Sequence, residues 1–313
     1  MDLPPLDDLR WIVSQYAQLR AAHGEAIGTP ELVEPTGEFF PDAFTPSPEG
    51  VAGLLKRLLT YAPVSEHLGW ELGFVEAEGG GGGGCSSGAC GTGGGGGALI
   101  GEAVPHPQGE GYRVQVAVRD VGDPVVLTAS LARCVGGMIL GEAGEELSGV
   151  VEERFATSEI AATLSGFGLL LLNGACVYTK SCGGLRAHQS TRLDVPSCAV
   201  ALALFLRVHD VKPGLARRHL ETTQAEAFDE ALRWVDSKPA LLEALQTHPE
   251  SLTSGDFPVE ESKGLFGRLF GARKATSPEL SPPPAVTRRA RSPEEERRLA
   301  ETKAMVEEAL RAR

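Results

Sequence analysis

Apolar side chains recur every three or four residues in two segments near the N-terminus, which is the spacing of one helix face. The first set is Leu6, Leu9, Val13, Tyr16, Ala17 and Leu19, and Gly24 stands where such a helix would end. The second set, Val51, Leu54, Leu55, Leu58 and Leu59, comes after Ser47-Pro48, an N-cap serine with proline at the first helical position. The pattern therefore predicts two helices in the first sixty residues.

Three segments after these helices are typical of β-strands, namely residues 70–76, 98–104 and 112–118. The last is the clearest, because Tyr112, Val114 and Val116 alternate with more polar positions. The short connection 105–111 favours an antiparallel pairing of the last two strands. We therefore expect a small antiparallel sheet.

The middle of the chain predicts buried helices. Asp123-Pro124 is a cap for a helix that runs to about Leu140, with Leu127, Leu131, Val135, Met138 and Ile139 at helical spacing. Gly136 and Gly137 cost such a helix about 1 kcal/mol each relative to alanine, which indicates close approach by another element. Residues 158–177 and 196–209 are strongly apolar, and 220–234 and 239–245 are amphipathic. Together the elements predict an α+β fold, with the sheet packed on a helical core.

The character of the chain changes after about residue 251. Residues 277–292 are rich in proline and arginine, as in linkers. Ser292-Pro293-Glu294-Glu295 has the pattern of a helix start. We predict an α+β domain at 1–250, a linker with a short amphipathic segment at 251–291, and a C-terminal helix at 292–313.

Composition is that of a folded protein, with 42% hydrophobic and 23% charged residues among 313. A net charge of −13 disfavours nucleic-acid binding, which requires a basic face. The acidic N-terminus lacks the apolar core of a secretory signal. The longest apolar run, 167–172, is far shorter than the ~20 residues of a membrane span. We therefore expect a cytoplasmic protein without a transmembrane segment, whose six cysteines are mostly reduced.

The segment Leu131–Gly137 has the spacing of a zinc-peptidase helix without its chemistry. In the pattern His-Glu-x-x-His, two histidines on one helix face hold the metal and the glutamate acts as general base. The overlay puts Arg133 and Gly137 at the histidine positions and Cys134 at the base position. Arginine cannot ligate zinc and glycine has no side chain, so the usual zinc site cannot form. The alternative is that the segment is simply a buried helix.

The residues after this segment strengthen the overlay. An acidic stretch with Glu152-Glu153 comes next, and then Gly166-Phe167-Gly168 and Asn173. With these features, residues 125–235 resemble bacterial zincin-like metallopeptidase proteins. In that family an acidic residue of the second helix completes the metal site, and the resemblance places it at Ser158 or Glu159. The resemblance implies a zincin-like core, no bound cofactor, and a catalytically inactive protein with a binding or regulatory role.

A second interpretation is a thiol-based metal-binding or redox protein. Cys85 and Cys90 lie in the glycine-rich segment 79–97, and thiolates bind zinc or copper(I). Two thiolates are too few for a closed site, and a glycine-rich insert without metal is the plainer interpretation. Zinc is therefore expected only if further ligands complete a cysteine site. Cys134 is either a nucleophile whose pKa Arg133 lowers, or a small core residue.

A third interpretation is an adaptor that acts through residues 264–313. Residues 263–274 mix aromatic and basic side chains, as in a docking segment or a terminal packing peptide. Isolated helices as long as 293–312 are marginal in water. A protein partner or self-association would therefore cover the apolar side of this helix.

Overall fold

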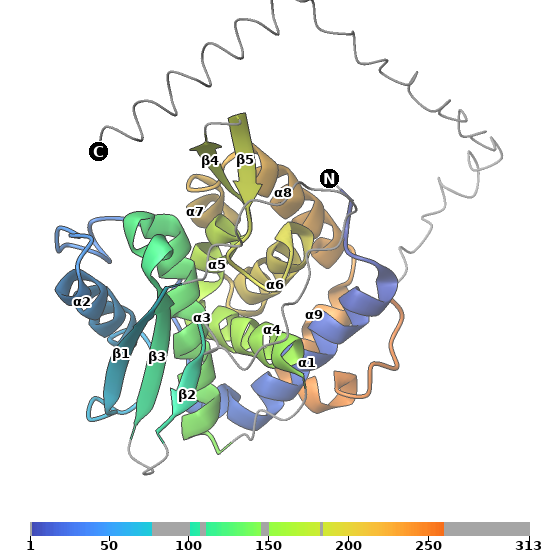
Figure 1. Ribbon diagram of the computed structural model, residues 1–313. Helices are drawn as coiled ribbons and strands as arrows, with labels where there is room; N and C mark the ends of the chain where they lie inside the picture. Colours follow the sequence, from blue (N-terminus) through green and yellow to red (C-terminus); the bar gives the residue numbers. More distant parts are fainter. Residues whose placement is uncertain (1, 77–100, 107–110, 145–149, 182–183, 260–313) are drawn as a thin grey trace, which may run out of the picture. The chain divides into compact units, whose positions relative to one another are not determined.

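The computed structural model describes residues 2–76, 101–106, 111–144, 150–181 and 184–259 (Figure 1). The chain divides into two units, Met1–Ser262 and Lys263–Arg313, and all described residues belong to the first. Cys85 and Cys90, the linker beyond residue 259 and the predicted C-terminal helix lie outside the described residues. The domain boundaries predicted there stay predictions.

The sheet has three strands in the order β1-β3-β2: β1 (Trp70–Val75), β2 (Ala103–Pro105) and β3 (Tyr112–Ala117). The antiparallel pairing of β2 with β3 is confirmed, and Ala103 lies opposite Val114. β1 runs parallel to β3, with Trp70 opposite Tyr112, so the sheet is mixed and the prediction of an antiparallel sheet is wrong for this pair. The chain reverses direction once before β2 and once after it, which returns β3 to the direction of β1.

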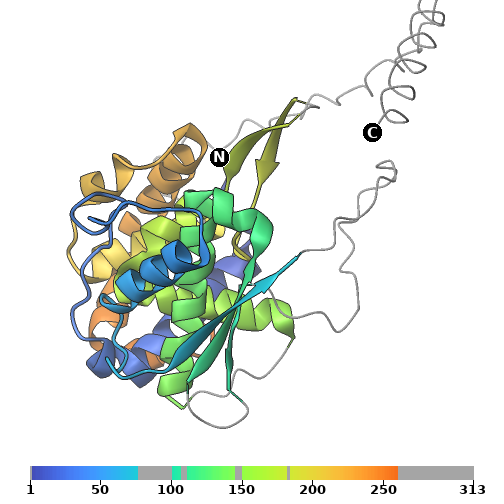
Figure 2. The same ribbon diagram turned by 60° about the vertical axis from the view of Figure 1, so that its left-hand side comes forward.

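The predicted motif helix is present as α3 (Pro124–Glu142), and every residue from Val126 to Leu140 except Thr128 is buried. Its N-terminus is capped as predicted, because Asp123 Oδ1 accepts hydrogen bonds from the backbone N–H groups of Val125 and Val126 at 3.1 and 3.2 Å. Side chains of α3 share one hydrophobic cluster with the inner face of the sheet; among them are Leu131, Val135, Met138, Tyr112, Val114 and Val116. Figures 1 and 2 show the sheet as an outer layer with the helical body on one side of it. The prediction that this helix packs on the sheet is confirmed.

The apolar segment predicted as one helix over 158–177 is instead two helices with a break. α4 (Val151–Ala162) leads through a π-helical turn, Thr163–Phe167, into α5 (Gly168–Gly174). Gly166 in the turn has φ +94°, and a Cβ there would lie 2.0 Å from the carbonyl oxygen of Glu31. The backbone N–H of Val33 donates to the Gly166 carbonyl at 3.0 Å. Close passage of the segment around residues 31–33 therefore explains the break.

After α5 the chain forms an antiparallel hairpin of β4 (Val177–Ser181) and β5 (Gly184–His188), which the sequence pattern did not predict. The prediction that the helix reaches residue 177 is wrong for this reason.

The other helices are α1 (Leu6–Ile27), α2 (Pro48–Leu59), α6 (Val195–Val208), α7 (Pro213–Arg217), α8 (Thr222–Asp236) and α9 (Pro239–Thr247). α6 is buried over most of its length and lies in a cluster with α1 and α8. α1 continues past Gly24 and ends before Gly28, whose φ is +69°. This arrangement confirms the α+β class.

Two helical segments, Pro124–Glu142 and Val151–Gly174, are long and apolar enough to cross a membrane by length and composition alone. Of their most apolar stretches, 72% and 89% are buried inside the fold. Buried core helices of soluble proteins also meet these criteria of length and composition. The described part of the chain therefore contains no clear transmembrane segment.

Candidate functional site

Helices α3 and α4 approach closely at two glycines. A Cβ on Gly136 would lie 2.0 Å from the carbonyl oxygen of Ser158, so this position admits no side chain without moving α4. A Cβ on Gly137 would lie 3.4 Å from Ser158 Oγ, which is ordinary contact. Arg133 precedes these glycines by three and four residues and therefore shares their helix face. The glycine contact thus places Arg133 against α4.

Arg133 meets Glu159 directly, with Nη1 3.1 Å from Oε1. The arginine is 6% exposed and the glutamate 0%. Ser158, the other position that the resemblance allowed, donates its hydroxyl to the Arg154 carbonyl at 2.9 Å. The structure therefore brings together Arg133 and Glu159 of the sequence candidates.

Arg133 also donates hydrogen bonds to two main-chain carbonyl groups. Nε donates to the Gly101 carbonyl at 2.9 Å, and Nη1 donates to the Ser190 carbonyl at 2.7 Å. The guanidinium carbon also lies 4.9 Å from the centroid of the Phe155 ring. A Cβ on Gly101 would lie 2.1 Å from Nη2, and φ there is +77°, so only glycine fits beside the guanidinium. Arg133 thus joins α3 to α4, to the start of the β2 segment and to the chain after β5.

The Glu159 carboxylate is also satisfied by the backbone. Oε1 accepts from the N–H of Arg192 at 2.7 Å, and Oε2 accepts from the N–H of Leu193 at 2.8 Å. Burial raises the pKa of Glu159, while Arg133 and these two backbone donors lower it because each favours the charged form. Each oxygen of the carboxylate therefore has at least one donor from within the protein.

Cys134, at the position of the general base, is 1% exposed and is a free thiol. Burial raises its pKa to about 12, and the smaller opposing influence of Arg133 does not offset this. A thiol with such a pKa is neutral at physiological pH and is a poor nucleophile. These properties favour the interpretation of Cys134 as a core residue.

We expect Cys134 and Cys198 to resist a thiol reagent in the native protein at pH 8, because both thiols are buried and their pKa values are raised by burial. Half-buried Cys176 is the internal comparison and should react first of the three. Mass spectrometry of peptides after brief iodoacetamide treatment measures this. Rapid labelling of Cys134 under native conditions would contradict the core interpretation.

The acidic groups around this centre were candidates for metal ligands. Among the residues that the structure describes, no three His, Cys, Asp or Glu side chains converge as a metal site requires. Glu102 lies near the pair and bonds Arg154 at 3.2 Å, and burial raises its pKa. Its Oε2 is buried without a hydrogen-bond partner in the described structure.

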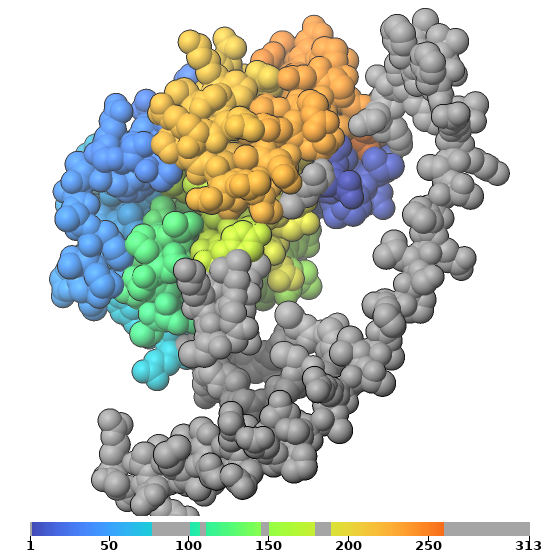
Figure 3. Space-filling model, turned by 90° about the horizontal axis from the view of Figure 1, so that it is seen from above, coloured from blue at the N-terminus to red at the C-terminus, as the bar shows by residue number. Residues whose placement is uncertain are grey.

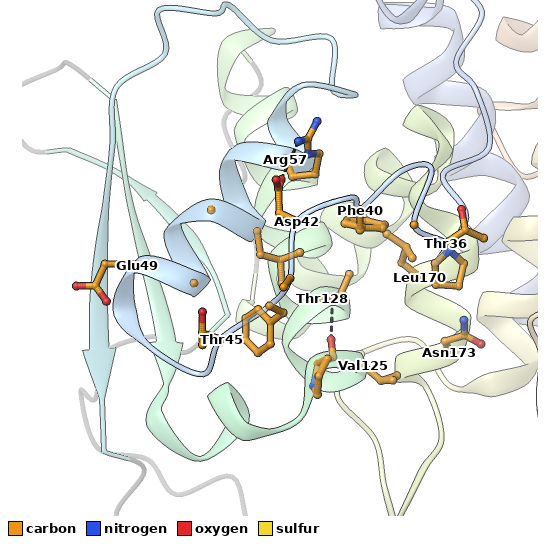
Figure 4. Close-up of a pocket in the computed structure, with 18 residues that line it drawn as sticks. Thr36, Phe40, Asp42, Thr45, Glu49, Arg57, Val125, Thr128, Leu170 and Asn173 are labelled. Atoms are coloured by element: carbon orange, nitrogen blue, oxygen red, sulfur yellow. Dashed lines mark hydrogen bonds and ion pairs between the residues drawn. The ribbon is translucent and has the colours of Figure 1, made fainter.

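A separate cavity of about 640 Å³ lies beyond the N-terminal end of α3 (Figure 4). Its walls come from the loop before α2, from α2 itself, from the first turns of α3 and from the end of α5. Apolar side chains form most of the lining, among them Phe40, Phe44, Leu54, Val125 and Leu170. None of the residues of the Arg133–Glu159 network lines it.

Polar groups stand on different sides of this cavity (Figure 4). Arg57 Nη2 pairs with Asp42 Oδ2 at 2.7 Å on one side, and Asn173 lies on another. The Thr128 hydroxyl donates to the Pro124 carbonyl at 2.6 Å. Glu49 lies in the capped first turn of α2, and hydrogen bonds with its own backbone and with Ser47 lower its pKa.

The loop that forms one wall is held by a cluster at Glu34. Glu34 Oε2 accepts from Arg218 Nη2 at 2.5 Å and lies 2.7 Å from His219 Nε2. Burial raises the pKa of Glu34, but hydrogen bonds from Arg218 and His219 outweigh it and the net direction is downward. Figure 3 shows the surface of residues 28–60, in blue, against the yellow and orange surface of α7 and α8. The cavity wall is therefore attached to the helical core.

The sequence patterns did not predict this cavity. Its walls are far apart along the chain. The clearest sequence signal is the loop before α2, which contains three phenylalanines, Phe39, Phe40 and Phe44, together with Pro35, Pro41 and Pro46. Asn173 is conspicuous in the sequence only through the family resemblance. The cavity is formed by tertiary packing, and the spacing of apolar residues along the sequence does not predict tertiary packing.

Comparisons with known proteins give no family assignment: no family model, no curated protein and no solved structure matches this chain. The resemblance to zincin-like metallopeptidases therefore has only the residues of this chain to support it.

Proposed function

We propose that this chain is a catalytically inactive, zincin-like cytoplasmic protein with a binding or regulatory role. The observation that supports this is the 3.1 Å contact between Arg133 and Glu159. On the overlay these are the first histidine position and the acidic position of the second helix. A zincin metal site would hold a cation between these two positions. In this chain the residue at the first position, Arg133, carries the positive charge itself.

The chemistry of the motif positions supports the same proposal. Arginine stays protonated in proteins and cannot act as a base. Cys134 is a neutral buried thiol with a pKa of about 12, and Gly137 has no side chain. The motif helix therefore offers neither a general base nor a nucleophile at these positions.

The thiol interpretation receives no support at Cys134 for this reason, and its other residues, Cys85 and Cys90, lie outside the described residues. The adaptor interpretation rests on residues 264–313, which also lie outside them. Both stay proposals of lower rank than the non-catalytic zincin-like protein.

We expect the purified protein to show no metal-dependent peptidase activity, because Arg133, Cys134 and Gly137 replace two ligands and the base. The assay is cleavage of casein with added zinc, with and without a chelator. A chelator-sensitive cleavage that Cys134→Ala abolishes would contradict the proposal. Contaminating protease is controlled by a preparation of the Arg133→Met variant purified in parallel.

Restoring the motif tests the overlay itself. The triple variant Arg133→His, Cys134→Glu and Gly137→His should bind about one zinc ion per chain, because a tetrahedral zinc site needs three protein ligands and Glu159 supplies the third. Position 137 admits a Cβ, since the nearest atom to it is Ser158 Oγ at 3.4 Å, which belongs to a side chain that can rotate.

The measurement is zinc content and calorimetric titration of the folded variant. Adding Glu159→Gln should weaken zinc binding at least about tenfold if Glu159 is a ligand. A folded triple variant that binds no zinc, or binds equally well with Glu159→Gln, would show that the overlay is wrong.

A further inference from the structure

Two glycines of α2 near the cavity differ in what surrounds them. A Cβ on Gly50 would lie 1.9 Å from the carbonyl oxygen of Thr45, so the chain passes too closely for any side chain there. A Cβ on Gly53 would meet nothing within 4 Å, and Gly53 lines the cavity. A glycine inside a helix costs about 1 kcal/mol relative to alanine. No packing contact at Gly53 offsets this loss of helix stability. The absence of a side chain at Gly53 leaves open space in the cavity.

The size and the lining of the cavity suit a small molecule. Its volume of about 640 Å³ lies within the range of about 300–1,000 Å³ typical of ligand pockets. Phe40, Phe44, Leu54 and Leu170 offer an apolar wall. Val125 on the cavity wall is 43% exposed, which leaves apolar surface for a ligand to cover.

Charge at the cavity favours a neutral ligand. The charged side chains beside the cavity are Asp42 and Arg57, and Arg57 Nη2 pairs with Asp42 Oδ2 at 2.7 Å. The carboxylate of Glu49, which also belongs to the lining, points away from the cavity (Figure 4). An anion would therefore find no unpaired cation among the lining side chains. The groups left for recognition are neutral, namely the amide of Asn173 and the hydroxyls of Thr36 and Thr45.

We propose that this cavity binds a neutral, largely apolar small molecule with a hydroxyl or amide group that bonds Asn173. The proposal rests on the non-catalytic binding role above and names the class of ligand for it. The site is distinct from the Arg133–Glu159 pair, so binding needs no residue of the degenerate motif.

The test uses the full chain and the neutral dye N-phenyl-1-naphthylamine, whose fluorescence rises in apolar surroundings. We expect saturable binding of one dye per chain with a Kd of about 1–10 µM, which is usual for a ligand of this size. Decan-1-ol should displace the dye. Decanoate at pH 8 has a chain of the same length with a negative charge and should displace it at least about tenfold less well.

The matched variants are Gly53→Leu and Gly214→Leu. Both glycines lie in helices, and a Cβ on either would meet nothing within 4 Å. Only Gly53 lines the cavity. Gly53→Leu should weaken dye binding at least about tenfold by filling the space, and Gly214→Leu should leave it unchanged. Replacing a helix glycine favours the helix, so Gly53→Leu is expected to melt no lower than the wild type.

Absence of saturable dye binding would overturn the proposal, and so would equal binding by Gly53→Leu and wild type. Displacement by decanoate as effective as by decan-1-ol would overturn the neutral-ligand class. The casein assay on the same preparations separates the two proposals. Metal-dependent cleavage would remove the non-catalytic role, whereas a negative dye titration would remove the ligand site alone.

Discussion

Replacing Arg133 with methionine should lower the free energy of unfolding by about 3–5 kcal/mol, because it leaves the fully buried Glu159 without its counter-charge. The carboxylate would keep only its two backbone donors, from Arg192 and Leu193. Methionine preserves much of the apolar length of the arginine side chain. The decrease in the free energy of unfolding therefore measures the loss of the charge and of its hydrogen bonds. Urea unfolding at pH 8 measures the change.

The dependence on pH identifies the cause. Without Arg133, the pKa of Glu159 loses its largest lowering influence and rises further above the unfolded value of about 4.3. A carboxyl whose folded pKa is raised contributes stability below the unfolded pKa and loses it as pH rises towards the folded pKa. The deficit of Arg133→Met should therefore be larger at pH 8 than at pH 5. Adding Glu159→Gln removes the titrating group, so the deficit of the double variant should not change between these pH values.

The control is Arg217→Met. Arg217 pairs with Asp229 at 2.8 Å, but their side chains are 55% and 39% exposed. Such a pair contributes about 0–1 kcal/mol. If Arg133→Met costs no more than Arg217→Met, the buried pair does not hold α3 and α4 together.

Adding one methyl group at Gly136 should destabilise the fold by about 3 kcal/mol, at the upper end of overpacking effects. The new Cβ would lie 2.0 Å from the Ser158 carbonyl, which belongs to the backbone of α4 and cannot rotate away. The adjacent Gly137→Ala is the matched control. Its Cβ meets Ser158 Oγ at 3.4 Å, so the gain in helix propensity of about 1 kcal/mol is retained.

Thermal unfolding separates the two variants. For a domain of this size about 1 kcal/mol shifts the Tm by roughly 2–4 °C, so Gly136→Ala should melt roughly 6–12 °C lower than the wild type. Gly137→Ala should melt at or slightly above it. Equal losses for both variants would mean that the close approach at Gly136 is not what fixes the spacing of α3 and α4.

Local signals in the sequence predict several elements well. Ser47-Pro48 and Asp123-Pro124 cap helices as expected, since a cap depends only on neighbouring residues. The buried helix predicted at residues 196–209 is α6, which occupies 195–208. Gly24 is misleading, because a glycine inside a long helix is a modest cost that tertiary packing of α1 overcomes.

Features that depend on distant segments were not predictable. The parallel pairing of β1 with β3 depends on the path of the chain between them. The break at Gly166 depends on Glu31, which precedes it by more than a hundred residues.

The candidate site was predictable only in part. Spacing and resemblance single out Arg133, Cys134, Gly137 and Glu159. The choice between Ser158 and Glu159 requires the rotation of α4 about its own axis, which no pattern gives. The Arg133 guanidinium donates to the main-chain carbonyls of Gly101 and Ser190, so the identity of the side chain at Ser190 gives no signal for its bond.

The contact of Arg133 with Gly101 also has a consequence for chain length. It fixes the backbone just before β2, while pairing with β3 fixes Val75 at the end of β1. Neither contact involves residues 77–100, because Val75 pairs within the sheet and Gly101 is bound by the Arg133 guanidinium. A change in the length of the segment between these two anchors would therefore leave both contacts in place.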